Sequence, residues 1–322
     1  MNTPHESASR LEHFPVALFA SVMGMAGLCL AWLKAQHLGL LPGDGGAVLR
    51  WLASGLFAFL LLAYATKLLR HPAAVRAERA HPLKQNFFPA ISIGLLLLAS
   101  AWAPAAPGVA IWLWGIGAAL HLLFTLQAMG GWIHHTHFEI KHATPAWFIP
   151  VVGNILVPLV GVHFAPADIS WFFFSIGLVF WLLLLTIVLY RLFFHEPLPA
   201  RLTPTLFILL APPSVGFLAY LALTDSLDAF ARILYFTALF LALLLASNAL
   251  RFLRVPFFIS AWAYSFPLAA LTLATLEMGS RTGLAFYAWL GWGLLAALTL
   301  VVAVLSVKTL KAALQGRICL PE

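Results

Sequence analysis

Residues 262–272 read WAYSFPLAALT, and this short stretch poses the central question of the fold. It lies within a long apolar run that should form one helix, yet Phe266 and Pro267 stand side by side near its middle. Proline removes a backbone donor and clashes with the preceding turn, so it bends a helix. The pair therefore predicts a bend near the middle of this helix.

The composition indicates which surroundings this chain is suited to. Its 322 residues are 62% hydrophobic and only 9% charged, whereas soluble domains carry about 25% charged residues. Lipid must therefore form part of its surroundings. The first ten residues, MNTPHESASR, contain no apolar run ending in a small-residue cleavage site, so we expect no cleaved signal peptide. Cys29 and Cys319 predict neither a disulfide framework nor a metal cluster.

Ten apolar runs are long enough to cross a bilayer, which takes roughly 20 residues. They cover residues 14–36, 46–69, 86–103, 107–129, 146–165, 169–193, 203–224, 228–249, 255–277 and 284–307. The connections are short, so successive helices should form antiparallel hairpins. We predict an all-α integral membrane protein with a single transmembrane domain over residues 1–322.

The distribution of positive charge predicts the orientation. With ten spans both termini lie on one side, and fourteen of the eighteen Lys and Arg residues fall on that side. Cytoplasmic loops carry an excess of Lys and Arg. We therefore expect a multi-pass protein of the bacterial inner (plasma) membrane with both termini in the cytoplasm.

The prolines alternate between successive spans. Those of the odd-numbered spans are Pro15, Pro89, Pro150, Pro158, Pro204, Pro212, Pro213, Pro256 and Pro267, whereas the interiors of the even-numbered spans contain none. In lipid, a carbonyl freed by proline needs a partner from protein or trapped water. This pattern favours five inner, kinked helices around a central pore and five straight outer helices, in a quasi-five-fold arrangement of hairpins. The alternative is chance, because prolines are frequent in membrane helices.

The predicted inner helices carry small and polar residues in place of charges. Asp, Glu, Lys and Arg are missing from them except at their ends, and such residues usually mark coupled transport. Half-helix dipoles and unpaired N–H groups can favour an anion without a buried cation. The candidate kink and lining residues are Ser21, Gly24, Pro89, Gly153, Asn154, Pro158, Pro212, Pro213, Ser265 and Pro267. For each glycine, close helix packing is the competing explanation.

Five stretches resemble the tellurite-resistance/dicarboxylate transporter family, which includes bacterial TehA and the plant guard-cell slow anion channels. They are GLCLAW (27–32), HPLKQNFFPAI (81–91), HATPAWFIPVVGN (142–154), LAPPSVGFLAY (210–220) and WAYSFPLAA (262–270). They occur in the family's order and extend over most of the chain.

The resemblance implies ten helices in five hairpins, a pore through each protomer, and a homotrimer. It also implies that a phenylalanine of the ninth helix plugs the pore, and Phe266 occupies that position. Gly24, Gly153 and Pro212 lie where the family has small residues at helix kinks. Pro267 departs from TehA, which has a small residue there, and is closer to the plant channels. Chloride, nitrate, malate, sulfite and tellurite have all been attached to family members, so the resemblance does not define the anion.

Three other features have competing explanations. The segment His134–His142, with Glu139, could bind a metal, but a solvated interfacial loop is the preferred interpretation. His121 lies in an even-numbered helix, where a contact with a neighbouring helix or subunit is favoured over a role in transport. The basic run from Lys67 to Lys84 could bind anionic lipid headgroups or simply set the topology.

The leading hypothesis is an anion channel, or channel-like efflux protein, in which Phe266 occludes the pore. The alternative is a coupled carrier or exporter for four-carbon dicarboxylates or oxyanions such as sulfite or tellurite. A third is a metalloenzyme that uses the His134–His142 segment. We expect no enzymatic activity, no cofactor, no metal and no nucleic-acid partner; the expected partners are small anions, membrane lipid and further copies of the chain.

Overall fold

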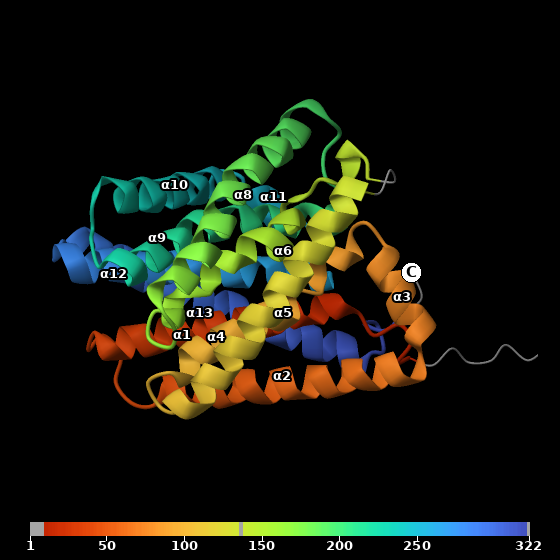
Figure 1. The fold of residues 1–322 in the computed structure, drawn as a ribbon, viewed down its shortest axis with the longest axis horizontal. Coiled ribbons are helices and arrows are strands. Elements are labelled where there is room, and N and C mark those ends of the chain that lie inside the picture. The colour runs from red at the N-terminus through yellow and green to blue at the C-terminus, as the bar shows by residue number, and fades with distance from the viewer. Residues whose placement is uncertain (1–9, 135–137, 321–322) are drawn as a thin grey trace, which may run out of the picture.

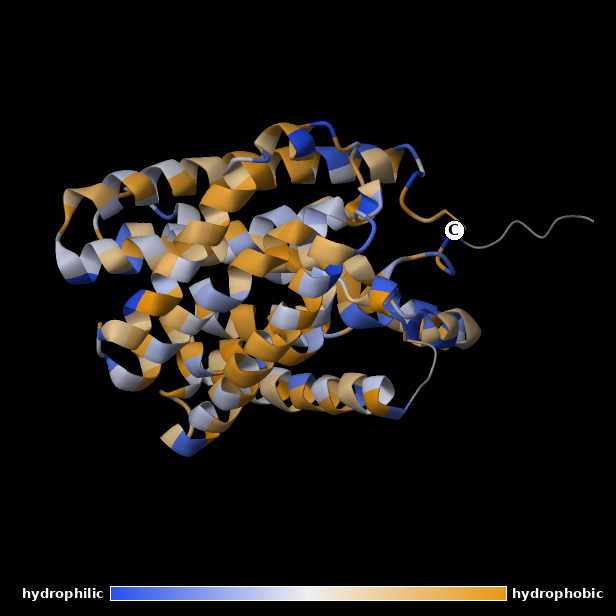
Figure 2. Ribbon diagram, turned by 90° about the horizontal axis from the view of Figure 1, so that it is seen from above, coloured by the Kyte–Doolittle hydropathy of each residue, from blue (hydrophilic) through white to orange (hydrophobic). Residues whose placement is uncertain are grey.

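The computed structural model describes residues 10–134 and 138–320 and is helical throughout these ranges, apart from connecting turns (Figure 1). Nine helical stretches in these ranges are long and apolar enough to cross a membrane. They are Val16–His37, Gly45–Arg70, Lys84–Trp102, Pro107–His134, Ala167–Phe194, Ala200–Thr224, Ala229–Ala246, Ile259–Thr282 and Ala285–Leu314. Hydrophobic residues dominate the long helices, and hydrophilic residues gather towards their ends (Figure 2). The protein is therefore a multi-pass membrane protein.

The fifth expected span, 146–165, is the one that differs most from a regular helix. It consists of short pieces: η4 (Pro145–Trp147), α6 (Phe148–Val152), η5 (Gly153–Leu156) and α7 (Pro158–Gly161). All residues from 145 to 158 are buried. Prolines and a glycine interrupt the backbone so often that no long α-helix can form. The exact ten-helix, quasi-five-fold arrangement stays a prediction.

Burial alternates along the chain as the prolines predict. In the most apolar windows of the four long stretches with prolines in or beside them, 67–72% of residues are buried. The corresponding fraction is 22–33% in α2 (Gly45–Arg70), α5 (Pro107–His134), α8 (Ala167–Phe194), α10 (Ala229–Ala246) and α13 (Ala285–Leu314). The prediction that proline-bearing segments lie inside is confirmed for these segments. We call the five proline-bearing stretches the inner segments and the other five the outer helices.

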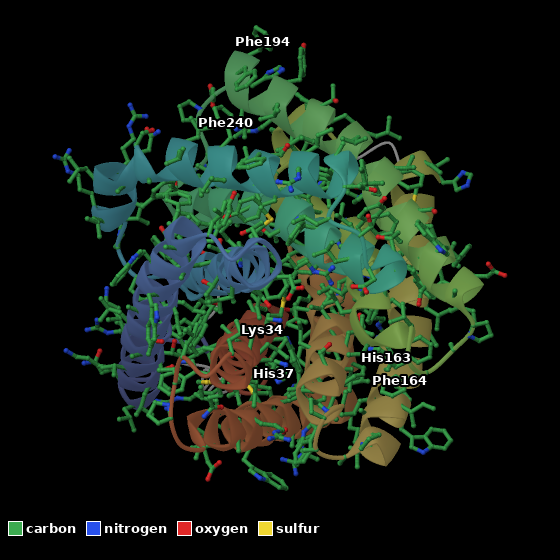
Figure 3. All side chains as sticks on the ribbon, turned by 90° about the vertical axis from the view of Figure 1, so that its left-hand side faces the viewer. Lys34, His37, His163, Phe164, Phe194 and Phe240 are labelled. Atoms are coloured by element: carbon green, nitrogen blue, oxygen red, sulfur yellow. The ribbon has the colours of Figure 1, made fainter. Side chains whose placement is uncertain are left out.

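The inner segments contact one another in a closed series. Helix α1 (Phe19–His37) contacts α4 (Ala90–Trp102), α4 contacts η5, η5 contacts α9 (Ala211–Thr224), α9 contacts α12 (Ser265–Thr282), and α12 contacts α1 again. The outer helices cover this series, as α5 covers α4 and α13 covers α12. The bundle viewed end-on in Figure 3 shows the inner segments surrounded by outer helices.

Each inner segment changes its helical geometry near its prolines. A 3₁₀ stretch precedes the α-helix in every case: η1 (Val16–Leu18), η2 (Lys84–Phe87), η4, η6 (Ala200–Leu210) and η7 (Ile259–Tyr264). Pro89 is the N-cap of α4, and Pro212, Pro213 and Pro267 stand in the first turns of α9 and α12. The first four N–H groups of an α-helix have no intrahelical acceptor. A proline at one of these positions therefore removes no intrahelical hydrogen bond. The prolines therefore begin α-helices, rather than kinking continuous ones as expected.

The short helix α3 (Pro72–Ala80) is anchored by a buried ion pair at the end of the bundle where the C-terminus lies (Figure 1). Lys67 Nζ lies 2.7 Å from Glu78 Oε2, and both side chains are less than 10% exposed. Glu78 also accepts hydrogen bonds from the Val16 N–H and the Tyr64 hydroxyl. These contacts join α2, α3 and the start of the first inner segment.

Candidate functional site

A cavity of about 60 Å³ lies where the inner segments meet. All five of them contribute to its wall. The lining residues are Ala20, Met23, Phe87, Ile93, Phe148, Ile149, Val152, Gly153, Ile155, Leu156, Ile208, Ala211, Pro212, Val215, Trp262, Ala263, Phe266 and Pro267. Within the described ranges none of these residues is charged, and the Trp262 indole N–H is already donated to Thr309 Oγ1 at 2.9 Å. A single water molecule needs roughly 10–15 Å³ of cavity volume. This cavity therefore has room for only a few water molecules.

Phe266 lies in the wall of this cavity and is 8% exposed. It stands in the first turn of α12, next to the 3₁₀ stretch η7. Across from it on α1 is Gly27, where an added Cβ would lie 3.5 Å from Phe266 Cδ2 and 2.7 Å from Ala269 Cβ. The lack of a side chain at Gly27 therefore allows α1 and α12 to approach closely beside the ring.

Four of the candidate residues, Gly153, Pro212, Phe266 and Pro267, line the cavity together. The remaining candidates lie outside its wall and pack between segments. Gly24 is an example, because an added Cβ would lie only 2.1 Å from Ser265 Oγ. Pro89, Pro158 and Pro213 mark the beginnings of α4, α7 and α9.

The candidate serines satisfy backbone carbonyls instead of facing the cavity. Ser21 donates to the Leu18 carbonyl and Ser265 to the Trp262 carbonyl, both at 2.6 Å and both three residues back in the chain. The acceptors belong to the 3₁₀ stretches that precede α1 and α12. These hydroxyls therefore stabilise the change from 3₁₀ to α geometry.

Asn154 belongs to a buried polar network that supports the broken fifth segment. Its Nδ2 donates to Thr125 Oγ1 at 2.8 Å and to the Val151 carbonyl at 2.7 Å. Thr125, from the outer helix α5, lies 2.7 Å from the carbonyl of Pro150. Trp114 of the same helix donates to the Val157 carbonyl at 3.0 Å. Side chains of α5 thus donate hydrogen bonds to carbonyls of the interrupted fifth segment. Within a membrane, backbone carbonyls must find such partners inside the protein.

His121 is also part of this support. It is fully buried, with Nδ1 2.8 Å from Ser92 Oγ of α4. An added Cβ at Gly153 would lie 2.5 Å from the His121 ring. The expected contact with a neighbouring helix is therefore confirmed, and it requires glycine at position 153.

The prediction of small and polar lining residues did not include the apolar residues of the wall. Phe87 and Phe148 each stand two positions before a proline, in FFP (87–89) and FIP (148–150), and Phe266 stands directly before Pro267. All three rings line the cavity. The sequence signal that identifies these wall residues is an aromatic residue one or two positions before a proline of an inner segment.

The segment His134–His142 lies partly outside the described residues, since 135–137 are not described. Glu139 and His142 form a reciprocal capping box around η3 (Ile140–His142). Hydrogen bonding to the Lys141 ammonium, 2.9 Å away, lowers the pKa of the Glu139 carboxyl below its usual value. Among the described residues, no group of three or more His, Cys, Asp or Glu side chains could hold a metal ion.

An all-α membrane protein whose inner segments enclose a narrow apolar cavity has the architecture of a channel or carrier. The profile of the SLAC1 family, described as voltage-dependent anion channel, matches residues 13–310, and the chain belongs to this family. The resemblance drawn from the five sequence stretches is thereby confirmed.

Three relatives illustrate the family. The S-type anion channel SLAH3 of Arabidopsis thaliana is 29% identical over 277 residues, covering 83% of this chain and 43% of the relative. The tellurite resistance protein TehA homolog of Haemophilus influenzae is 29% identical over 273 residues, covering 80% and 79%. An uncharacterized transporter of Methanocaldococcus jannaschii is 25% identical over 335 residues, covering 96% and 98%. The chain spans about half the length of the plant channels SLAH3 and SLAH2.

Proposed function

We propose that this chain conducts small anions passively along the axis between its inner segments, and that Phe266 closes this path. The observation that carries the proposal is the cavity itself, because all five inner segments meet there and Phe266 forms part of its wall. An apolar constriction blocks ions by excluding water. The membership of a family described as anion channels supports the choice of anions.

Passive conduction is favoured over coupled transport by the chemistry of the wall. Proton- or sodium-coupled carriers generally place ionisable residues within the membrane near the substrate. In the described ranges, the cavity wall contains no such side chain. We also propose that the chain catalyses no reaction and needs no cofactor, because its family is described as anion channels.

We also propose a membrane location, an oligomeric state and an orientation for the channel. We place it in a bacterial inner membrane as a homotrimer of single transmembrane domains, each with its own pore and both termini in the cytoplasm. The described chain ends support a position on the same side of the membrane, since a Cβ at Gly316 would lie 3.1 Å from the side chain of Arg10. An even number of crossings places both ends on one side.

The test is current recording from the wild type and Phe266→Ala in planar bilayers, with chloride, nitrate and malate in asymmetric salt. Removing the ring opens the cavity wall, so we expect a strong rise in anion current and reversal potentials that follow the anion gradient. Phe217→Ala is the matched control, because Phe217 is a fully buried phenylalanine of α9 that does not line the cavity.

An unchanged current in Phe266→Ala, with normal protein in the membrane, would contradict the gate. Saturable, proton-dependent flux without channel currents would instead favour a coupled carrier for dicarboxylates or oxyanions.

A further inference from the structure

Four charged residues form a network at the end of the bundle opposite the described chain ends, and we call this end the far mouth. Lys34 Nζ lies 2.6 Å from Glu277 Oε2, and Arg281 Nε lies 2.6 Å from Glu277 Oε1. Arg281 also donates to Asp225, through Nη2 to Oδ1 at 2.7 Å and through Nη1 to the carbonyl at 3.0 Å. The network joins α1, α12 and the C-terminus of α9, which are all inner segments.

Two members of the network lie on the helix faces that line the cavity. Glu277 follows Phe266 by eleven residues, and Lys34 follows Met23 by the same number. Eleven residues are close to three turns of an α-helix, so each pair shares one face with an axial separation of roughly 16 Å. Phe266 and Met23 both line the cavity. Figure 3, which faces this end of the bundle, shows Lys34 near the middle of the inner segments.

Three of the four charged side chains are only partly solvated, whereas that of Asp225 is 89% exposed. The side chain of Glu277 is 16% exposed, and those of Lys34 and Arg281 are each 26% exposed. Lys34, Glu277 and Arg281 all lie near the ends of stretches that are long and apolar enough to span a membrane. Ionisable residues within such segments pair with one another and often mark ion or substrate pathways, and these three are paired.

We propose that Lys34 and Arg281 form an anion site at the far mouth, and that the carboxylate of Glu277 occupies it as a tethered competitor. One carboxylate oxygen faces the lysine and the other faces the arginine, so the site accommodates a carboxylate. A small carboxylate from solution could make the same charge-assisted hydrogen bonds once Glu277 turns away. This inference rests on the proposed function, because it places the site at one end of the proposed path.

The first test measures binding independently of conduction. Purified wild type, Glu277→Gln and Glu277→Gln/Lys34→Gln are titrated with sodium acetate at constant ionic strength, and binding is followed by the shift in melting temperature. Partly exposed ion pairs contribute about 0.2–1 kcal/mol, so Glu277→Gln should lower the half-saturating acetate concentration by a factor of about 1.4 to 5. The added Lys34→Gln should abolish this gain.

Two matched controls separate a site from a general change in charge. Asp168→Asn removes a negative charge at the exposed first turn of α8, and Arg232→Gln removes a positive charge at the exposed start of α10, both outside the network. If Glu277→Gln binds acetate no better than the wild type or Asp168→Asn, the tethered-competitor proposal is wrong. If Arg232→Gln abolishes the gain as fully as Lys34→Gln does, the site is not local.

The second test uses acetate currents in the Phe266→Ala background. Glu277→Gln should shift the acetate dependence of the current from the far side by the same factor, and Asp168→Asn should not. If all variants lack anion current, the proposed function fails while the binding result still stands. If currents are present but all variants share one acetate dependence, the site is not on the conduction path and the inference fails alone.

Discussion

Single glycines set the distance between neighbouring inner segments. Gly24 faces Ser265, whose side chain is fully buried and bonded to the Trp262 carbonyl. A methyl group at position 24 has no room, since the Ser265 Cβ would lie 2.7 Å away. This contact fixes how closely α1 approaches α12 beside Phe266.

Gly24→Ala should therefore destabilise the protein by about 1–3 kcal/mol, the usual cost of overpacking a core. Gly55→Ala is the control, because Gly55 lies in α2 with nothing within 4 Å of an added Cβ. There alanine should be neutral or stabilising by about 0.5–1 kcal/mol. Unfolding in one detergent measures both, and equal stabilities of the two variants would contradict the close contact.

The buried Lys67–Glu78 pair makes a second prediction for single residues. Glu78→Gln leaves the Lys67 ammonium without its counter-charge, which typically costs about 3–5 kcal/mol when a buried pair is broken. The double variant Lys67→Met/Glu78→Gln should recover part of this loss. Glu139→Gln breaks an exposed pair with Lys141 and should leave the unfolding temperature unchanged. A similar result for Glu78→Gln would show that the pair is not important for stability.

Among the elements, the inner segments differ from ordinary membrane helices by their 3₁₀ stretches. The stretch η6 contains 11 residues, whereas runs beyond 3–4 residues are uncommon and often mark hinges. The fifth segment depends most on its neighbours, because α5 supplies hydrogen bonds that its interrupted backbone cannot make internally. The outer helices thus support the polar backbone of the inner ones.

Thr125→Val tests this support. The variant removes the hydroxyl that lies between the Pro150 carbonyl and Asn154 Nδ2, and an unsatisfied buried polar group costs about 1–3 kcal/mol. Thr186→Val is the control, since Thr186 is an exposed residue of the outer helix α8 whose hydroxyl donates to the carbonyl of Leu182. We expect a lower unfolding temperature for Thr125→Val only. If the two variants unfold alike, the fifth segment does not rely on α5.

At the scale of the whole molecule, the two ends of the bundle differ in their content of positive charge. Most Lys and Arg residues belong to the end that carries the described chain ends, and we propose that this end faces the cytoplasm. The far mouth carries the network of Lys34, Glu277, Arg281 and Asp225. The proposed path therefore joins a basic mouth to one in which Lys34 and Arg281 are paired with carboxylates.

Labelling of single cysteines tests this orientation. The variants are made in a Cys319→Ser background. The remaining native cysteine, Cys29, is fully buried and should not react with the label. A membrane-impermeant maleimide added to intact spheroplasts should label Asp168→Cys, at the far end, and should label Lys311→Cys only after the membrane is opened. The reverse pattern would show that the termini lie outside.

The sequence by itself determined the membrane class, nine spanning helices of the ten expected within the described residues, the alternating burial of the segments and the family. The class, the spans and the burial were predictable because hydropathy and the missing N–H of proline act locally, wherever the segment lies, and the family was predictable because its motifs are short local stretches. The tertiary structure alone decided that Phe87, Phe148 and Phe266 share one wall, that Gly24 faces Ser265, and that Lys34 meets Glu277. It also showed that prolines begin α-helices after 3₁₀ stretches. Such facts depend on distances between segments far apart in the chain, and these distances arise only when all the segments pack together.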